Sequence, residues 1–137
     1  MKRFLMKVII GGLTLLLLSI LALMIVVKLM PWLAEEYYDP MFDLDMNSSK
    51  GWLFFVHPFV LSLALAWFWR RFKGLFHGSF WWRGTEVGVV YGLIATIPSM
   101  WITYSSLAVS LTMILTWVAY GFFQAIVLGV IYAKMSP

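Results

Sequence analysis

Four long apolar runs alternate with short polar segments along the chain. The runs lie at about residues 8–28, 51–70, 84–105 and 107–133, and charged residues are almost confined to the segments around them. A hydrocarbon core about 30 Å thick is crossed by about 20 predominantly apolar residues in a helix, which is close to the length of each run. The pattern therefore predicts an all-α integral membrane protein, a four-transmembrane-helix bundle in which residues 1–137 form a single membrane domain.

The positions of the basic residues predict how this bundle is oriented. Lysine and arginine occur at both termini and in an inner basic loop at 70–83, whereas the acidic residues gather in an outer acidic loop at 29–50. Cytoplasmic segments of membrane proteins carry an excess of lysine and arginine. We therefore expect the N-terminus and the C-terminus to be cytoplasmic. The basic residues that set this orientation are Lys2, Arg3, Lys7, Arg70, Arg71, Lys73, Arg83 and Lys134.

Composition supports the same class. Hydrophobic residues make up 63% of the chain, charged residues 12%, and the mean hydropathy is +0.91. A soluble domain is about 45–50% apolar and about 25% charged. The absence of cysteine from the sequence excludes disulfides, thiol redox chemistry and thiolate metal ligands. Because the basic residues flank apolar runs, the positive net charge reports topology, and we expect no nucleic-acid partner.

The first run has two interpretations, a cleaved signal peptide or a retained helix. Lys2, Arg3 and Lys7 precede it, as basic residues precede the apolar region of a signal peptide. Its apolar region is longer than the about 7–15 residues of a signal peptide, and the following "KLMPWLAEEYY" offers no small-x-small cleavage site. We therefore expect a retained transmembrane helix.

Small residues recur at every fourth position in the last two runs. They are Gly84, Gly88 and Gly92 in the third run and Gly121, Ala125 and Gly129 in the fourth. Helices in a bilayer gain little from hydrophobic association, so small residues favour close packing of their backbones. The short connection between these runs predicts an antiparallel hairpin with the two strips as its packing seam. The alternative is the general abundance of glycine in membrane helices.

Glu86 is a candidate polar site in the third run. It lies two residues from Gly84, about 200° around a helix of 3.6 residues per turn, and so points away from the seam. A helix that begins at Gly84 places Glu86 in its first turn, where the helix dipole favours a carboxylate, and within pairing reach of Arg83. We favour a paired glutamate at the interface over a proton-coupling site, which belongs nearer the membrane centre. Small multidrug exporters carry a glutamate in their first span, where this sequence has none.

Two other polar residues within the runs are candidate sites. His57 precedes Pro58 in "FVHPFV", where a histidine could bind a haem, a metal or a quinone. His77, the other histidine, lies in the inner loop, so one chain does not supply two histidines at one depth to a haem. We favour a structural histidine near the headgroups and predict no cofactor. Gln124 in the fourth run is either a polar site or a partner in a hydrogen bond between helices.

The outer loop contains carboxylates that could bind a cation. The candidate metal ligands are Glu35, Glu36, Asp39 and Asp43. The stretch "DLDMNSS" matches the first ligand positions of an EF-hand, but Ser48 replaces the required glycine and Phe54 replaces the bidentate glutamate. We therefore favour a solvated acidic face or a contact for a partner. The stretch "PWLAEEYYDPMF" predicts a short aromatic helix in the membrane interface.

Two segments of the chain resemble a group of small, uncharacterised four-span prokaryotic membrane proteins. They read "LFFVHPFVLSLALAWFWRRFKGLFHG" and "IATIPSMWITYSSLAVSLTMILTW". The resemblance implies the same four-span topology and a multi-pass location in a prokaryotic inner (cytoplasmic) membrane. It implies no active site.

The sequence contains no recognisable catalytic motif. It lacks a serine–histidine–acid arrangement, a phosphate loop, a histidine–glutamate metal pattern and a nucleotide fingerprint. The sequence therefore predicts a non-enzymatic accessory or stabilising subunit of a larger membrane assembly. The alternatives are a small oligomeric transporter or ligand-binding membrane protein and, less favoured, an enzyme acting on lipid. The expected partners are membrane lipids and either other membrane subunits or further copies of the chain. A transporter needs polar groups that converge on a cavity, so the position of Gln124 relative to Ser62 and His57 separates the first two functions.

Overall fold

The computed structural model describes residues 2–42 and 49–136, and every regular element within these ranges is a helix. Four helical segments of this part of the chain are long and apolar enough to cross a membrane. They are α1 (Lys2–Leu29), α3 (Ser49–Phe72), a continuous segment formed by α4 (Phe80–Tyr91), η2 (Gly92–Thr96) and α5 (Ile97–Ser106), and α6 (Leu111–Met135). The predicted all-helical fold with four helices of spanning length is confirmed.

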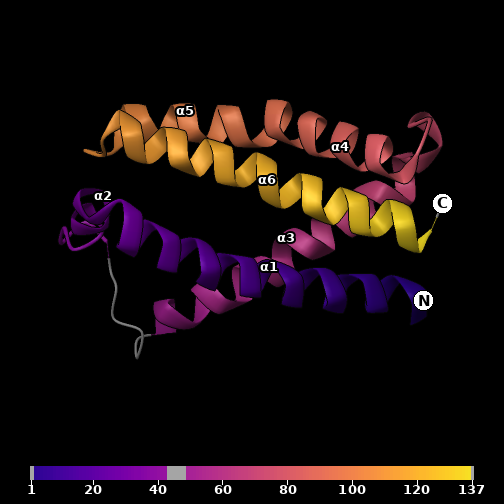
Figure 1. The fold of residues 1–137 in the computed structure, drawn as a ribbon, viewed down its shortest axis with the longest axis horizontal. Coiled ribbons are helices and arrows are strands. Elements are labelled where there is room, and N and C mark those ends of the chain that lie inside the picture. Colours follow the sequence, from indigo (N-terminus) through magenta and orange to yellow (C-terminus); the bar gives the residue numbers. More distant parts are fainter. Residues whose placement is uncertain (1, 43–48, 137) are drawn as a thin grey trace.

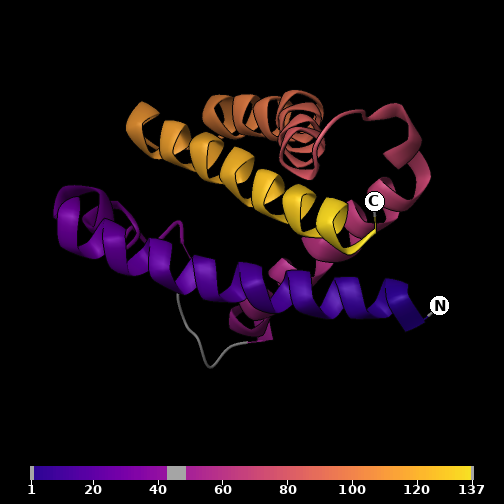
Figure 2. The same ribbon diagram turned by 45° about the vertical axis from the view of Figure 1, so that its right-hand side comes forward.

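The spans pack as two antiparallel hairpins (Figure 1). In one hairpin α1 lies against α3, and in the other α4 and α5 lie against α6. Contacts of α6 with α1 and α3 join the hairpins. Figures 1 and 2 show both termini at one end of the molecule, with the connection from η1 (Lys73–Leu75) to α4 nearby. The short helix α2 (Pro31–Glu36) lies at the opposite end, beside the turn between α5 and α6.

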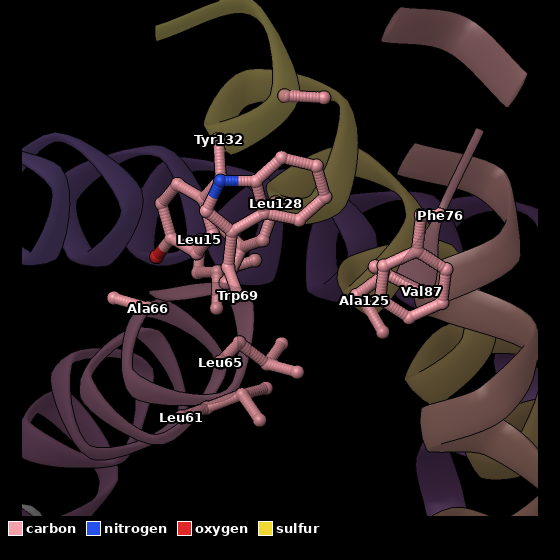
Figure 3. Close-up of a cluster of buried hydrophobic side chains, with 11 residues drawn as sticks. Leu15, Leu61, Leu65, Ala66, Trp69, Phe76, Val87, Ala125, Leu128 and Tyr132 are labelled. Carbon is pink, nitrogen blue, oxygen red and sulfur yellow. The ribbon is translucent and has the colours of Figure 1, made fainter. Parts of the chain in front are cut away.

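The main core joins α1, α3, α4 and α6 in the half of the bundle that holds the termini (Figure 3). Trp69 of α3 and Tyr132 of α6 are fully buried there, together with Leu15 of α1. The ring of Phe76, just after η1, stacks on Trp69 with centroids 6.2 Å apart and planes 4° from parallel. This stacking holds the segment that follows α3 against the main core.

A second cluster holds α2 to the start of α6. Its buried members include Leu33 of α2 and Met113 of α6. Trp117 Nε1 donates a hydrogen bond of 2.6 Å to the hydroxyl of Tyr37, and the ring of Phe42 meets that of Trp117 edge-on. The sequence predicted a short aromatic helix in this region, and α2 with the aromatic residues after it packs on the bundle.

Capping residues shift the ends of two predicted spans. Gly78, with φ of +99°, adopts a left-handed turn that other residues disfavour. Ser79 follows it and caps α4 by accepting a hydrogen bond of 3.4 Å from the amide of Trp82, so this helix begins at Phe80 rather than at residue 84. Ser110 caps α6 in the same way, which moves the start of the fourth span from residue 107 to Leu111.

The third span carries a π-helical turn, η2, immediately before α5. Pro98 lies in the first turn of α5 and has no amide hydrogen to donate to the preceding turn. Local widening of a helix is one way in which the backbone accommodates such a missing hydrogen bond. The span continues through the turn, so residues 80–106 act as one membrane-length segment.

Candidate functional site

The glycines of α4 lie directly against the backbone of α6. A Cβ atom added to Gly88 would come within 2.6 Å of the amide nitrogen of Ile126, and one added to Gly84 would meet the backbone of Val130. A Cβ at Gly129 would lie 3.1 Å from the Cα of Gly84. Because carbon atoms do not approach so closely, these positions accept only glycine while the helices keep their present separation.

The two predicted strips do not face each other residue by residue. Gly92 faces the ring of Phe122, and Gly121 faces Thr96. Ala125 is buried in the main core. The seam therefore consists mainly of glycine on α4 against larger residues of α6, with direct contact of small residues where Gly84 meets Gly129.

A second close approach, on α1, was missed in the sequence. A Cβ at Gly11 would come within 2.5 Å of the hydroxyl oxygen of Ser62 and would also collide with the hydroxyl of Tyr132, while one at Gly12 would strike the ring of Phe59. The adjacent glycines in "IIGGL" are the signal that could have indicated it. They let α3 and α6 approach α1 at the same level.

Hydroxyl groups link three helices beside Gly11. The Ser62 hydroxyl donates to the carbonyl of Val8 at 2.8 Å and lies 2.7 Å from the Tyr132 hydroxyl, which also donates to the carbonyl of Ser62 at 3.0 Å. Two hydroxyl protons serve these three contacts, so one proton is shared. Such bonds between membrane helices contribute about 0.6 kcal/mol on average and up to about 1.7 kcal/mol. They fix the position of α6 relative to the first hairpin.

Gln124, Ser62 and His57 do not converge. Gln124 is buried with 4% of its surface exposed, and it lies eight residues before Tyr132 on α6. Eight residues correspond to about 12 Å along a helix, which separates the amide from the Ser62 network. His57 is exposed on α3, whereas Pro58 beside it is buried.

Glu86 is partly buried in the second turn of α4, because that helix begins at Phe80. Its predicted position in the first turn of the span is therefore wrong. Arg83, its expected partner, is directed elsewhere, with its guanidinium 5.0 Å from the ring centre of Trp69. Arg83 Nη2 also donates to the carbonyl of Lys73 at 3.4 Å. Arg83 thus packs against the end of α3 and the turn after it instead of pairing with Glu86.

The candidate metal ligands have separate structural contacts. A carboxylate oxygen of Glu36 accepts a hydrogen bond of 3.3 Å from the amide of Ser110, at the start of α6, and Asp39 accepts one of 2.8 Å from the amide of Met41. Glu35 is exposed, and Asp43 lies outside the described residues. Within residues 2–42 and 49–136, no group of three or more acidic, histidine or cysteine side chains is placed to hold a metal ion.

A basic cavity of about 310 Å³ lies at the end of the bundle that holds the termini. Four cations line it, namely Arg3 and Lys7 of α1, Arg70 of α3 and Lys73 of η1. In the sequence these residues served only as a topology signal. Their spacing could have indicated the cluster, because residues three or four apart share a helix face. Lys7 follows Arg3 by four residues, and Lys73 follows Arg70 by three.

Comparison of the chain with models of protein families, with curated proteins and with solved structures finds no match. The resemblance to small four-span prokaryotic proteins stays a prediction.

Proposed function

We propose that this chain is a non-catalytic, multi-pass protein of a prokaryotic inner membrane that acts as an accessory or stabilising subunit of a larger assembly. In this proposal both termini and the loop at 70–83 face the cytoplasm. Two observations support this orientation. The termini lie at the same end of the bundle as the basic residues, and α2 with its carboxylates lies at the opposite end. This arrangement agrees with the bias of lysine and arginine towards the cytoplasm.

The main support for the proposal is that the hydroxyl groups between the helices form hydrogen bonds within the bundle. Ser62 and Tyr132 bind each other, and the hydroxyls of Ser19 in α1 and Tyr120 in α6 lie 2.9 Å apart. Other hydroxyls bind carbonyls of the preceding turn of their own helix, as in Thr14, Thr103 and Thr116. These bonds position helices. Transport of ions and most membrane catalysis instead need ionisable groups held within the bilayer.

The outer surface of the bundle offers large apolar groups to its surroundings. Exposure reaches 67% for Trp52 and 63% for Leu53 near the start of α3, and 78% for Trp101 in α5. In Figure 1 the first half of α3 lies beside α1 and away from α6. Aromatic side chains are enriched in the energetically dominant parts of protein interfaces. In the proposed assembly these surfaces contact neighbouring subunits and lipid.

Copurification from native membranes tests this function. The full chain, carrying an affinity tag and extracted with a mild detergent, is expected to recover other membrane proteins in constant ratio. Alanine at His57, Glu86 or Gln124, each changed singly, is expected to leave this association intact, because the proposal gives these residues no role in it. Recovery of the tagged chain alone would contradict the proposal.

A small oligomeric transporter is the second candidate, and one observation favours it. Gln124 is a polar residue within α6 of which only 4% is exposed, and its amide makes no hydrogen bond to any residue that the structure describes. Polar groups held within a bilayer are costly and often serve function. Loss of a transport signal on changing Gln124 to alanine would support this candidate over the accessory subunit.

A further inference from the structure

The basic cavity brings together cations from separate parts of the chain. Arg3 and Lys7 lie in the first turns of α1, Arg70 lies near the end of α3, and Lys73 lies in η1. The described residues that line the cavity include no aspartate or glutamate. The cations around the cavity repel each other, and an anion bound between them would offset this repulsion by attracting each of them.

Helix dipoles account for only half of this cluster. Arg70 lies in the last turn of α3 and Lys73 follows that helix in η1, close to its C-terminal end, where the partial negative charge of the helix favours cations. Arg3 and Lys7 lie at the N-terminal end of α1, where the partial positive charge disfavours them. The cytoplasmic bias of basic residues explains why they share one side of a membrane. It does not explain why they surround one cavity.

Lys7 is the buried member of the cluster. Only 8% of its surface is exposed, whereas Arg3 and Arg70 are exposed residues. An ammonium group that faces this cavity has reduced access to water, and an opposite charge beside it would stabilise it. The guanidinium of Arg70 lies 5.9 Å from the ring centre of Phe4, which places this second cation over an aromatic face beside the cavity. The cavity therefore presents one buried and one oriented cation.

The rest of the lining is mostly apolar. Phe4, Met6 and Met135 contribute to it, together with Ser136, whose hydroxyl accepts a hydrogen bond of 3.2 Å from Trp69 Nε1. Inorganic phosphate would use the cations alone. A phospholipid would use both parts of the lining, with its phosphate at the cations and its glycerol and first acyl carbons at the apolar groups. Basic pockets between membrane helices on the cytoplasmic side are suited to anionic headgroups.

We propose that this cavity binds the phosphate-bearing headgroup of an anionic phospholipid, with Lys7 and Arg70 as the principal cations. The site lies where α1 begins and where α3 and α6 end, which in a membrane is the level of the headgroups. A bound lipid would join the two hairpins through α1, α3 and α6. It would therefore stabilise the folded chain.

Thermal unfolding of the purified full chain in an uncharged detergent tests the site. The melting temperature is measured as short-chain phosphatidylglycerol, short-chain phosphatidylcholine or inorganic phosphate is added. Phosphatidylglycerol is expected to raise it with a saturable dependence, and the other two are not. Each basic residue near anionic lipid contributes about 1 kcal/mol, so Lys7→Gln and Arg70→Gln are each expected to weaken apparent affinity about five-fold.

Lys134→Gln is the matched control, because Lys134 is an exposed cation at the same end that does not line the cavity. It is expected to leave affinity for phosphatidylglycerol unchanged. If Lys7→Gln does not fold, Arg3→Gln replaces it, since Arg3 lines the cavity from an exposed position.

Four results would overturn the proposal. An equal rise in melting temperature with inorganic phosphate would identify a free-phosphate site. An equal rise in melting temperature with phosphatidylcholine would show that the site has no preference for anionic lipid. Equal weakening by Lys134→Gln would indicate a diffuse basic surface. No rise with any of the three additives would leave the cavity without a ligand of this class.

Discussion

The hydroxyl of Tyr132 in α6 and that of Ser62 in α3 lie 2.7 Å apart, in the space that Gly11 of α1 leaves open. A Cβ atom at residue 11 would collide with both hydroxyl oxygens. The contact therefore depends on three helices that are far apart in the sequence. It links the two hairpins within the main core.

Removing the hydroxyl of Tyr132 is expected to destabilise the bundle. Tyr132→Phe keeps the buried ring but deletes the bonds to the hydroxyl and carbonyl of Ser62. We expect the free energy of unfolding in detergent to fall by about 0.6–1.7 kcal/mol. Tyr104→Phe, at an exposed tyrosine of α5, is the control and should change it little. Equal effects of the two substitutions would show that the hydroxyl contact contributes nothing.

The close approach of α4 to α6 makes a second prediction. Gly88→Ala adds one carbon that would lie 2.6 Å from the backbone nitrogen of Ile126, so the helices must separate. We expect a loss of about 1–3 kcal/mol in unfolding free energy, as for overpacking of a core. Gly74→Ala is the matched control, because a Cβ there has no neighbour within 4 Å. A Gly88→Ala protein as stable as Gly74→Ala would contradict the packing seam.

The four helices could be predicted from the sequence because apolar runs of membrane length have few other structures open to them. The helix ends were less predictable. Ser79 and Ser110 determine where α4 and α6 begin, but Ser79 lies outside the apolar run of its span and Ser110 lies inside the run at 107–133. The spacing of the glycines indicated the α4 side of the seam, but their partners Ile126 and Val130 depend on the rotation of α6.

The basic cavity and the contact of Arg83 could not be predicted from the sequence, because they depend on how the helices pack. Lys7 and Lys73 are separated by most of two spans, and only the crossing of α1 and α3 brings them to one cavity. Arg83 was assigned to Glu86 on spacing along one helix. The ring of Trp69, on another helix, lies close enough to attract it instead.

Membrane orientation is a third prediction, and the absence of cysteine from the sequence makes it simple to test. A cysteine introduced at Tyr38, which is 80% exposed after α2, should react with an impermeant thiol reagent in intact cells. A cysteine at His77, exposed near the other end, should react only after the membrane is permeabilised. The opposite pattern would place both termini outside the cytoplasm.

Gln124 provides a fourth prediction, which separates the two candidate functions. Its amide makes no hydrogen bond within the described chain, so Gln124→Leu removes a polar group from the bundle without breaking a hydrogen bond. For an accessory subunit we expect the melting temperature in detergent to stay equal or rise. A lower melting temperature, or loss of a transport signal in vesicles, would indicate that the amide has a partner or substrate.

The central claim, that the chain is a subunit of a larger assembly, is tested most directly by the mass of the native particle. The tagged chain is extracted from its own membranes in mild detergent and weighed intact by native mass spectrometry. We expect a particle that contains this 15.8 kDa chain in fixed ratio with different membrane proteins. A particle whose mass is one copy, or a whole multiple of one copy, would contradict it.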